Sequence, residues 1–329
     1  MTNFLAVQYV NCGVEHFRAN QFERALAMFD AALQYDPEYS YALYNRATAL
    51  LSLGDYERGF REYEATWRLF HWRGFGPVRD DIDRLQALPM WRGEQGRLLL
   101  YHEMGFGDAI MAMRYLPELR QRAELTLVID PCLSRLARRF DIAVVESVPP
   151  DLTTFDYRLP FFGVMGVLGT IPNAPYISGG VWEIVHKRPR VGIAWSGRTQ
   201  TMFSLNDFLS RLTLDGFELY ALQPGTATGE VVSLPPGGDF ADVADRIAQM
   251  DHVICVDTAA IHLAGAMGHP SAHLVLPHQM DWRWWHAERW YPRIKTYRQA
   301  GHDWALPFNR INETLSTERK KLKEGELTN

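Results

Sequence analysis

A glycine-rich turn lies where an apolar stretch gives way to a helix-like stretch, in the sequence LLLYHEMGFGDAI at 98–110. Two glycines, Gly105 and Gly107, precede the acid Asp108. A strand, a glycine turn and a helix begin many nucleotide-binding units. A dinucleotide fingerprint needs a third small residue near position 110, where this chain has Ile110. The turn therefore predicts a ligand site without identifying a dinucleotide, and the role of Asp108 stays open at this point.

A second turn with chemical potential comes after an apolar strand, in the sequence VICVDTAAIHLAGA at 253–266. Asp257 or Thr258 can cap the helix of small residues that begins there. The helix dipole favours an anion at such an end, where exposed backbone amides can bind it. Those amides belong to Thr258, Ala259 and Ala260. His262 falls one turn further along the same face. The pattern fits a phosphate site, and it also fits a capped core helix with a hydrogen-bonded histidine.

Both turns lie in runs where strands alternate with helices, a pattern typical of parallel sheets. The first run predicts strands at 97–102, 125–130 and 142–147 and helices at 108–122 and 131–140. The second predicts strands at 190–197, 217–223, 230–236, 252–258 and 271–277 and helices at 239–250 and 259–268. Residues 155–172 between them are interpreted as loop-rich. We expect two Rossmann-like lobes that face each other across a cleft, with a ligand at the carboxyl ends of the strands.

The first seventy residues carry an internal repeat with a period of 34. The segment NQFERALAMFDAALQYDP at 20–37 aligns with GDYERGFREYEATWRLFH at 54–71. This resembles the tetratricopeptide repeat, with small residues where paired helices touch and Pro37 closing the first unit. The predicted helices are 5–18, 22–35, 39–52 and 56–69. Two repeats are fewer than independent stability usually needs, so we expect them to pack on the domain after them or on another copy. A structural lid and a partner-binding groove both remain open.

Composition restricts the class of protein. The chain has 329 residues, 47% hydrophobic and 22% charged, which is ordinary for a soluble globular protein of two or three domains. Its net charge of −5 disfavours a general nucleic-acid coat protein. Cys12, Cys132 and Cys255 show neither metal spacing nor a disulfide framework, and we expect them in the core. We see no signal peptide and no membrane span, so we expect a cytoplasmic protein.

Four motifs in a fixed order resemble the family-nine glycosyltransferases, the heptosyltransferase group. They are GFGDAIMAMRYLP, VGIAWSG, VDTAAIHLAGAMGHP and LPHQMDWRWWHAERWYPRIKTYRQ. The chain is most similar to bacterial proteins that join tetratricopeptide repeats to such a transferase. The resemblance covers about 90–300 for the transferase and 5–70 for the repeats. It implies the two-lobed GT-B fold and an inverting, metal-independent transfer from a nucleotide sugar.

The resemblance also gives the first turn a role. Asp108 is placed where the family has its general base, and a carboxylate can take the proton of an acceptor hydroxyl as that hydroxyl attacks. A helix N-terminus keeps a carboxylate ionised. A role as helix N-cap is compatible with this. Gly105 and Gly107 would give the acceptor room, and His102 would lie on the same acceptor side. His102 and Glu103 are the next candidates for the base.

The donor side is assigned by the same resemblance. The turn at 257–262 would bind the nucleotide phosphates, and Arg198 would neutralise the leaving diphosphate unless it is a solvated surface arginine. Gln223 and Phe240 fall where the family contacts the nucleoside. The loop at 195–205 is shorter than in the family, and Met104 and Met111 stand where it has glutamines. These departures leave the acceptor open. Four tryptophans can stack on sugars or pack between lobes, namely Trp282, Trp284, Trp285 and Trp290.

The predicted organisation is an α-helical repeat block and then an α/β GT-B fold. Its expected parts are repeats at 1–75, a connector at 76–96, an acceptor lobe at 97–180, a nucleotide-sugar lobe at 188–312 and a charged tail at 313–329. We expect a glycosyltransferase that uses a nucleotide sugar and no metal or other cofactor. Its acceptor is a glycan or a protein docked on the repeats, or less readily a nucleic acid, and a homo-oligomer is open. The alternative is an inactive scaffold that binds a partner through its repeats.

Overall fold

The computed structural model describes residues 3–69, 77–179, 188–197, 203–224, 229–301 and 303–323, without the side chains of 64–69 and 318–323. The chain divides into two compact units. The first comprises Met1–Pro172 and Gln279–Trp290, and the second comprises Asn173–His278 and Tyr291–Asn329. The stretch Gln279–Trp290 therefore belongs with the repeats and the first sheet, although the sequence placed it inside the lobe at 188–312.

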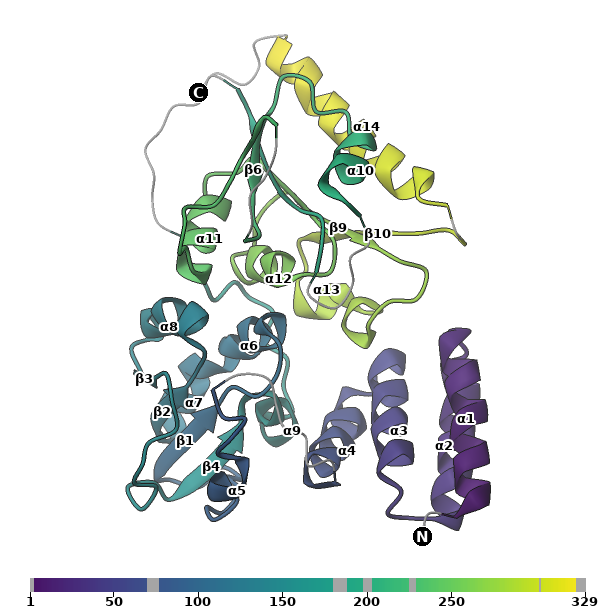
Figure 1. The fold of residues 1–329 in the computed structure, drawn as a ribbon, viewed down its shortest axis with the longest axis vertical. Coiled ribbons are helices and arrows are strands. Elements are labelled where there is room, and N and C mark those ends of the chain that lie inside the picture. Colours follow the sequence, from purple (N-terminus) through teal and green to yellow (C-terminus); the bar gives the residue numbers. More distant parts are fainter. Residues whose placement is uncertain are drawn as a thin grey trace. The chain divides into compact units, whose positions relative to one another are not determined.

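The repeat block consists of four consecutive antiparallel helices (Figure 1). They are α1 (Phe4–Arg18), α2 (Phe22–Tyr35), α3 (Ser40–Leu53) and α4 (Tyr56–Leu69). Their bounds agree with the prediction to within one residue at each end, because the repeat period fixed both helices of each pair. Gly54, with φ +82°, ends α3 in the left-handed region that favours glycine.

The small residues of the repeat lie where helices touch. A Cβ atom on Gly13 would be 2.4 Å from Cε1 of Phe29, and one on Gly59 would be 2.6 Å from Cδ2 of Leu51. Neither position has room for a side chain. The block does not stand alone: a Cβ on Gly166 of α9 (Val164–Leu168) would lie 3.3 Å from the carbonyl oxygen of Phe60. The expectation that the repeats pack on the domain after them is confirmed.

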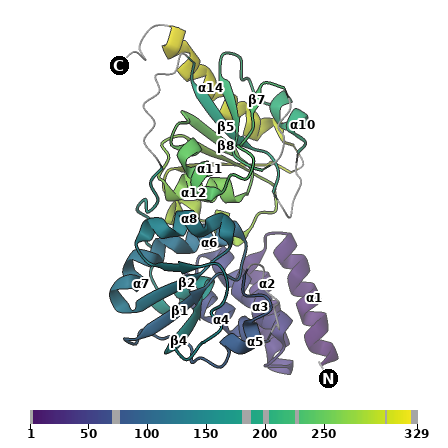
Figure 2. The same ribbon diagram turned by 60° about the vertical axis from the view of Figure 1, so that its left-hand side comes forward.

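The first unit contains a parallel sheet in the order β3-β2-β1-β4 (Figure 1), and Figure 2 shows β2, β1 and β4 from another side. Its strands are β1 (Arg97–Tyr101), β2 (Glu124–Val128), β3 (Ala143–Val145) and β4 (Tyr157–Pro160). Its helices are α5 (Ile82–Leu85), α6 (Phe106–Ala112), α7 (Leu116–Arg122), α8 (Pro131–Ala137) and α9, with 3₁₀ turns at Met113–Tyr115, Arg138–Phe140 and Phe161–Gly163. Strand β4 was predicted as loop. It is only four residues long and ends in a proline, which is a turn signal in sequence.

The second unit contains a parallel sheet in the order β10-β9-β8-β5-β6-β7. Its strands are β5 (Arg190–Ala194), β6 (Glu218–Ala221), β7 (Val231–Val232), β8 (His252–Cys255), β9 (Ala272–Leu276) and β10 (Ile294–Arg298). Helices α11 (Phe240–Ile247) and α12 (Ala259–Ala266) lie on one side, and α10 (Leu205–Ser210) and α14 (Ala305–Lys323) lie on the other (Figure 1). Helix α14 crosses the boundary expected at 312/313 without a break.

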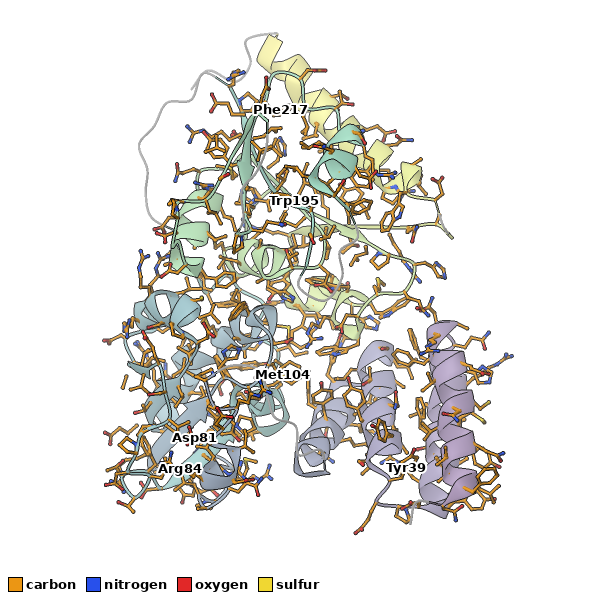
Figure 3. The ribbon with its side chains drawn as sticks, in the orientation of Figure 1. Tyr39, Asp81, Arg84, Met104, Trp195 and Phe217 are labelled. Carbon is orange, nitrogen blue, oxygen red and sulfur yellow. The ribbon has the colours of Figure 1, made fainter. Side chains whose placement is uncertain are left out.

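Each sheet has one point where the chain changes direction across it. Strands β1, β2 and β3 succeed one another to one side, and β4 lies on the other side of β1. Likewise β5, β6 and β7 succeed one another, and β8 starts the other half beside β5. Ligands of open α/β sheets bind beyond the carboxyl ends of strands at such a point. In Figure 3, Trp195 marks this end of the second sheet and Phe217 marks the opposite end.

Two expectations drawn from composition have different outcomes. Only Cys255 of the three cysteines is buried, whereas Cys12 is half-buried and Cys132 is exposed, so the prediction of three core cysteines was wrong for Cys132. Cys132 has apolar neighbours in the sequence, but its own side chain is on the exposed side of α8. In the described part of the chain, no helix is long and apolar enough to cross a membrane.

A buried chain of hydrogen bonds joins histidines near the amino ends of β8 and β9. His252 Nδ1 lies 2.8 Å from Ser271 Oγ, which lies 2.9 Å from His273 Nε2. His273 Nδ1 lies 2.9 Å from the hydroxyl of Tyr297. Burial, with a smaller contribution from the neighbouring His252, lowers the pKa of His273 to about 3. Burial also lowers the pKa of His269. His269 and His273 are therefore neutral in the folded protein at neutral pH.

This network predicts a loss of stability in acid. An unfolded histidine binds a proton below about pH 6.5, whereas folded His273 does not, so stability is complete above that pH and falls toward pH 3. The expected slope is about 1.4 kcal/mol per pH unit for each such histidine. Urea unfolding from about pH 7.5 to 4.5 measures it. His273→Gln should flatten the profile, and His278→Gln, at an exposed site, should not. Equal profiles for parent and His273→Gln would disprove this origin.

Candidate functional site

In the first unit, Asp108 lies at the start of α6, just beyond the carboxyl end of β1. The cap residue of this helix is Gly105, and Asp108 is its third residue, so the expected N-cap role for Asp108 was wrong. Its Oδ2 accepts the amide N–H of Gly105 at 3.1 Å. Gly107, the second residue of the helix, is half-buried. A Cβ at Gly105 would lie 3.3 Å from that same oxygen, so a glycine there leaves the carboxylate unobstructed.

The other oxygen of Asp108 pairs with Arg283, a contact that the sequence did not predict. Nη2 of Arg283 forms an ion pair with Oδ1 of Asp108, and Nη1 pairs with Oδ1 of Asp281 at 2.6 Å. Only 10% of the Arg283 side chain and 18% of the Asp108 side chain are exposed. Burial alone would lower the pKa of Arg283, but the two carboxylates outweigh it and raise the pKa above its ordinary value. The guanidinium is therefore a permanent buried cation beside Asp108.

His102 and Glu103, in the same turn, lie deeper than Asp108. Each is 1% exposed. Glu103 accepts the amide N–H of Phe161 at 2.9 Å and that of Phe162 at 3.0 Å, which ties the end of β1 to the end of β4. Burial raises the pKa of Glu103 to about 8, against the effect of these two amides. Burial also lowers the pKa of His102, which lies inside the unit and not on an open acceptor surface.

In the second unit, the turn after β8 presents backbone amides. Thr258 is the N-cap of α12, with φ −147° and ψ 165°. Its hydroxyl donates to the carbonyl of Val256 at 3.3 Å and makes no capping bond, so the predicted side-chain cap is not formed. Ala259 and Ala260 are the first two helical residues, whose amides have no carbonyl partner within a helix. The helix itself therefore leaves the amides at this end of α12 without a carbonyl partner.

His262 lies between the turn and a tyrosine. Its Nδ1 is 3.1 Å from the hydroxyl of Tyr291, and its Nε2 is 3.9 Å from Oδ1 of Asp257. The histidine is 4% exposed, whereas Asp257 is half-buried. His262 therefore supports the turn from behind. The sequence predicted the turn and its histidine but gave no sign of Tyr291, which lies 29 residues later.

Two further predicted donor residues lie at the same edge of the second sheet. Gln223, after β6, accepts the amides of Trp195 and Ser196 through Oε1, at 2.9 and 3.1 Å. It thus holds the loop after β5, a role that the sequence did not reveal. Phe240 is the half-buried first residue of α11, which Asp239 caps. Arg198 lies outside the described residues.

The comparisons with known proteins agree with this architecture. Residues 16–59 match the tetratricopeptide repeat model, and residues 218–302 match that of glycosyltransferase family 9 (heptosyltransferase). A segment that matches the tetratricopeptide repeat is thus followed in this chain by one that matches family 9. That segment runs from β6 to β10 and contains the Asp257 turn and Arg283. The predicted fold class, a repeat block and then a GT-B-like α/β fold, is confirmed.

Similar proteins have diverged far in sequence. Protein FlbA of Caulobacter vibrioides is 23% identical over 363 residues, covering 83% of this chain, and the chain spans 60% of the length of FlbA. The ADP-heptose lipopolysaccharide heptosyltransferase II of E. coli is 10% identical, covers 67% of this chain and 98% of its own, and has a TM-score of 0.46. The iron-containing dodecameric glycosyltransferase TibC of enterotoxigenic E. coli is 14% identical, covers 72% and 78%, and has a TM-score of 0.43.

The described side chains do not gather into a metal site: no group of three or more histidine, cysteine, aspartate or glutamate residues among them could hold an ion. The carboxylate of Asp108 has an arginine as its partner, and that of Glu103 has backbone amides.

The burial of Glu103 predicts how stability depends on pH in the neutral range. Its pKa is about 8 when folded and 4.5 in the ordinary state, so the folded protein retains a proton that the unfolded chain loses. This contribution is complete below about pH 4.5 and is lost as the pH rises through 8, at about 1.4 kcal/mol per pH unit. The difference in unfolding free energy between parent and Glu103→Gln should track that slope. Glu15→Gln, at an exposed helical site, is the control and should show no slope.

Proposed function

We propose that the protein is an inverting, metal-independent glycosyltransferase that moves a sugar from a nucleotide-sugar donor to an acceptor hydroxyl. The observation that carries this proposal is the position of the Asp257 turn. It lies beyond the carboxyl ends of β8 and β5, where the second sheet changes direction, and inside the segment that matches family 9. That is where an open α/β sheet binds a nucleotide.

On the donor side, the diphosphate rests on the amino end of α12. The amides of Ala259 and Ala260 point to it, and the helix dipole favours its negative charge. The small side chains let the phosphate approach the backbone. Gln223 holds the loop at Trp195 and Ser196 beside this turn, and Arg198 in that loop neutralises the leaving diphosphate. The nucleoside lies against Phe240.

On the acceptor side, Asp108 is the general base. As the acceptor oxygen forms its bond to the anomeric carbon, its proton passes to the free lone pairs of the Asp108 carboxylate. The bond from the anomeric carbon to the phosphate oxygen breaks, and the electron pair leaves with the nucleotide diphosphate. A single displacement of this kind inverts the anomeric configuration. Gly105 carries no side chain that would cover the carboxylate.

The same proposal covers the cofactor requirement, the acceptor and the cellular compartment. TibC contains iron, but the amide set of α12 can carry the diphosphate charge here, and we propose transfer without a metal. The acceptor is a glycan or a protein, for which the repeats offer a docking face, and TibC raises a homo-oligomer as a further proposal. The three free cysteines suit a reducing compartment such as the cytoplasm.

Asp108→Asn should lower kcat by about 100-fold or more, because the amide cannot accept the acceptor proton. Donor affinity should stay within about twofold, since the phosphate-binding residues belong to the second unit. The free energy of unfolding should fall by roughly 1–3 kcal/mol, because Arg283 then keeps only one carboxylate partner. Sugar transfer is measured with each nucleotide sugar that the protein binds.

Two results would contradict this mechanism. Parental turnover in Asp108→Asn would show that Asp108 is not the base; His102 and Glu103, the sequence's next candidates, are too buried to reach an acceptor. If turnover is lost in EDTA and recovered with manganese, the proposal that transfer needs no metal is wrong. Asp130→Asn is the matched control, since Asp130 also lies at the start of a helix, where it caps α8. That control should keep parental turnover.

Ala259→Pro should abolish nucleotide binding and leave the fold intact. Proline is tolerated at the first helical position and removes only an amide that has no helical partner. The extended conformation of Thr258 suits a residue before proline. The measurement is the rise in melting temperature with UDP, GDP, ADP, CMP and dTDP, which corresponds to about 2.7 kcal/mol at a hundredfold excess over Kd.

The control for this substitution is Leu205→Pro, at the first position of α10, on the other side of the same sheet. It should leave binding unchanged. Parental binding by Ala259→Pro would show that the turn is only structural. If the parent shows no shift with any nucleotide, the protein is a scaffold that binds partners through its repeats and does not transfer sugar.

A further inference from the structure

We infer that the stretch Gln279–Trp290 is a tether through which the repeat helices hold Asp108 in place, with Arg283 as the positioning residue. The inference rests on the proposed function, in which Asp108 is the base. All parts of the tether lie in the first unit: the repeats, the turn of Asp108 and the stretch itself. The repeats would then be part of the catalytic apparatus, whatever partner they bind.

The first link is the buried charge. Arg283 uses two different nitrogens for two carboxylates, Nη2 for Asp108 and Nη1 for Asp281. Because Oδ2 of Asp108 also accepts the amide of Gly105, each oxygen of that carboxylate has a fixed donor. A carboxylate held at both oxygens has its plane and its remaining lone pairs fixed in direction. Moving Arg283 would therefore rotate the carboxylate that receives the proton.

The second link fixes Arg283 itself. Its guanidinium carbon lies 4.4 Å from the ring centroid of Trp282 and 5.3 Å from that of Phe162. Phe162 comes after β4, and its amide is one of those held by Glu103. Cation–π contact of this kind is strongest where water is excluded. The guanidinium is thus held between aromatic rings as well as between carboxylates, and a shorter or uncharged side chain would lose both.

The third link joins the stretch to the repeats. Trp282 packs on Phe60 of α4, with ring centroids 5.6 Å apart, and Trp290 packs on Tyr56 at 5.2 Å. Trp285 packs edge-on against Phe22 of α2 at 4.9 Å. His286 Nε2 also lies 3.2 Å from the carbonyl oxygen of Ser52 in α3. Nε2 of Gln279 donates to the carbonyl oxygen of Arg18, the last residue of α1. All four repeat helices therefore contact the short stretch that carries Arg283.

These contacts revise the expected role of the tryptophans. Trp282, Trp285 and Trp290 pack on aromatic residues of the repeats, in place of the sugar platform or packing between lobes that the sequence left open. Within this short stretch, Trp282 and Trp285 contact the repeats, and Arg283, which lies between them in sequence, contacts Asp108. A displacement of α2 or α4 would shift the backbone at Arg283, and with it the base.

The test is a double-mutant cycle on kcat with Asp108→Asn, Arg283→Met and the combined variant. Arg283→Met should lower kcat about tenfold or more in the parent, since misplacement of a catalytic group by about 1 Å can cost that much. It should have less than about a twofold effect in the Asp108→Asn background, because Arg283 acts through Asp108. Donor affinity, measured by nucleotide thermal shift, should not change. Arg79→Met, at an exposed site of the first unit outside the tether, should keep parental kcat.

Arg283→Lys covers the case in which Arg283→Met does not fold. Lysine keeps the charge but has no planar fork for two carboxylates. It should fold, bind donor normally and lose about threefold to tenfold in kcat. Full and equal losses for Arg283→Met in both backgrounds, or parental kcat in Arg283→Lys, would overturn the positioning role.

The contact between the repeats and the tether is tested with Phe22→Ala, which removes the ring that packs edge-on against Trp285. It should lower kcat severalfold at unchanged donor affinity. Phe4→Ala removes a ring of the same kind that is 72% exposed, and it should leave kcat unchanged. Parental kcat in Phe22→Ala would overturn the tether. If Asp108→Asn itself keeps parental kcat, the proposed function of Asp108 has failed; if Asp108→Asn is impaired and Arg283→Met is not, only this inference has failed.

Discussion

A buried guanidinium is the interaction on which the first unit depends. A charge that is removed from water needs charged partners, or it destabilises the fold by several kcal/mol. Arg283 has two, Asp108 and Asp281, and its ring neighbours exclude water. This requirement places the stretch Gln279–Trp290 in the first unit, although the strands before and after it belong to the second. The tryptophans that flank Arg283 cover repeat helices, which are too few to be stable alone.

The two sheets share one topological feature that favours a ligand site. In each, the chain changes direction beside the first strand, and polar groups collect beyond the carboxyl ends of the strands there. In the first sheet, Glu103 joins the end of β1 to the end of β4. In the second, Gln223 joins the end of β6 to the loop after β5. Each joining side chain accepts two consecutive backbone amides, which fixes a loop next to one of the two candidate turns.

The sequence predicted the elements that neighbouring residues determine and missed the contacts between residues far apart in the chain. The repeat period predicted α1 to α4, and apolar runs between turn signals predicted most strands, because both patterns are written in neighbouring residues. The turns at Asp108 and Asp257 were predicted for the same reason. Strand β4 was missed, because its identity comes from pairing with β1, nearly sixty residues earlier. Arg283, 175 residues from its partner Asp108, carries no local signal beyond the tryptophans around it. The helix expected to begin at 108 begins at Phe106, an error of two residues at a helix end, where boundaries are least certain.

The segment between β9 and β10 contributes one side chain to each of the two candidate turns. Arg283 pairs with Asp108 in the first unit, and Tyr291, eight residues later, hydrogen-bonds His262 beside Asp257 in the second. A connection between two strands would otherwise need only a few residues, yet here it supplies a cation to one turn and a hydroxyl to the other. Tryptophans of this connection pack on the repeats, its Arg283 pairs with Asp108, and its Tyr291 hydrogen-bonds His262, so side chains of one short segment reach the repeats and both candidate turns.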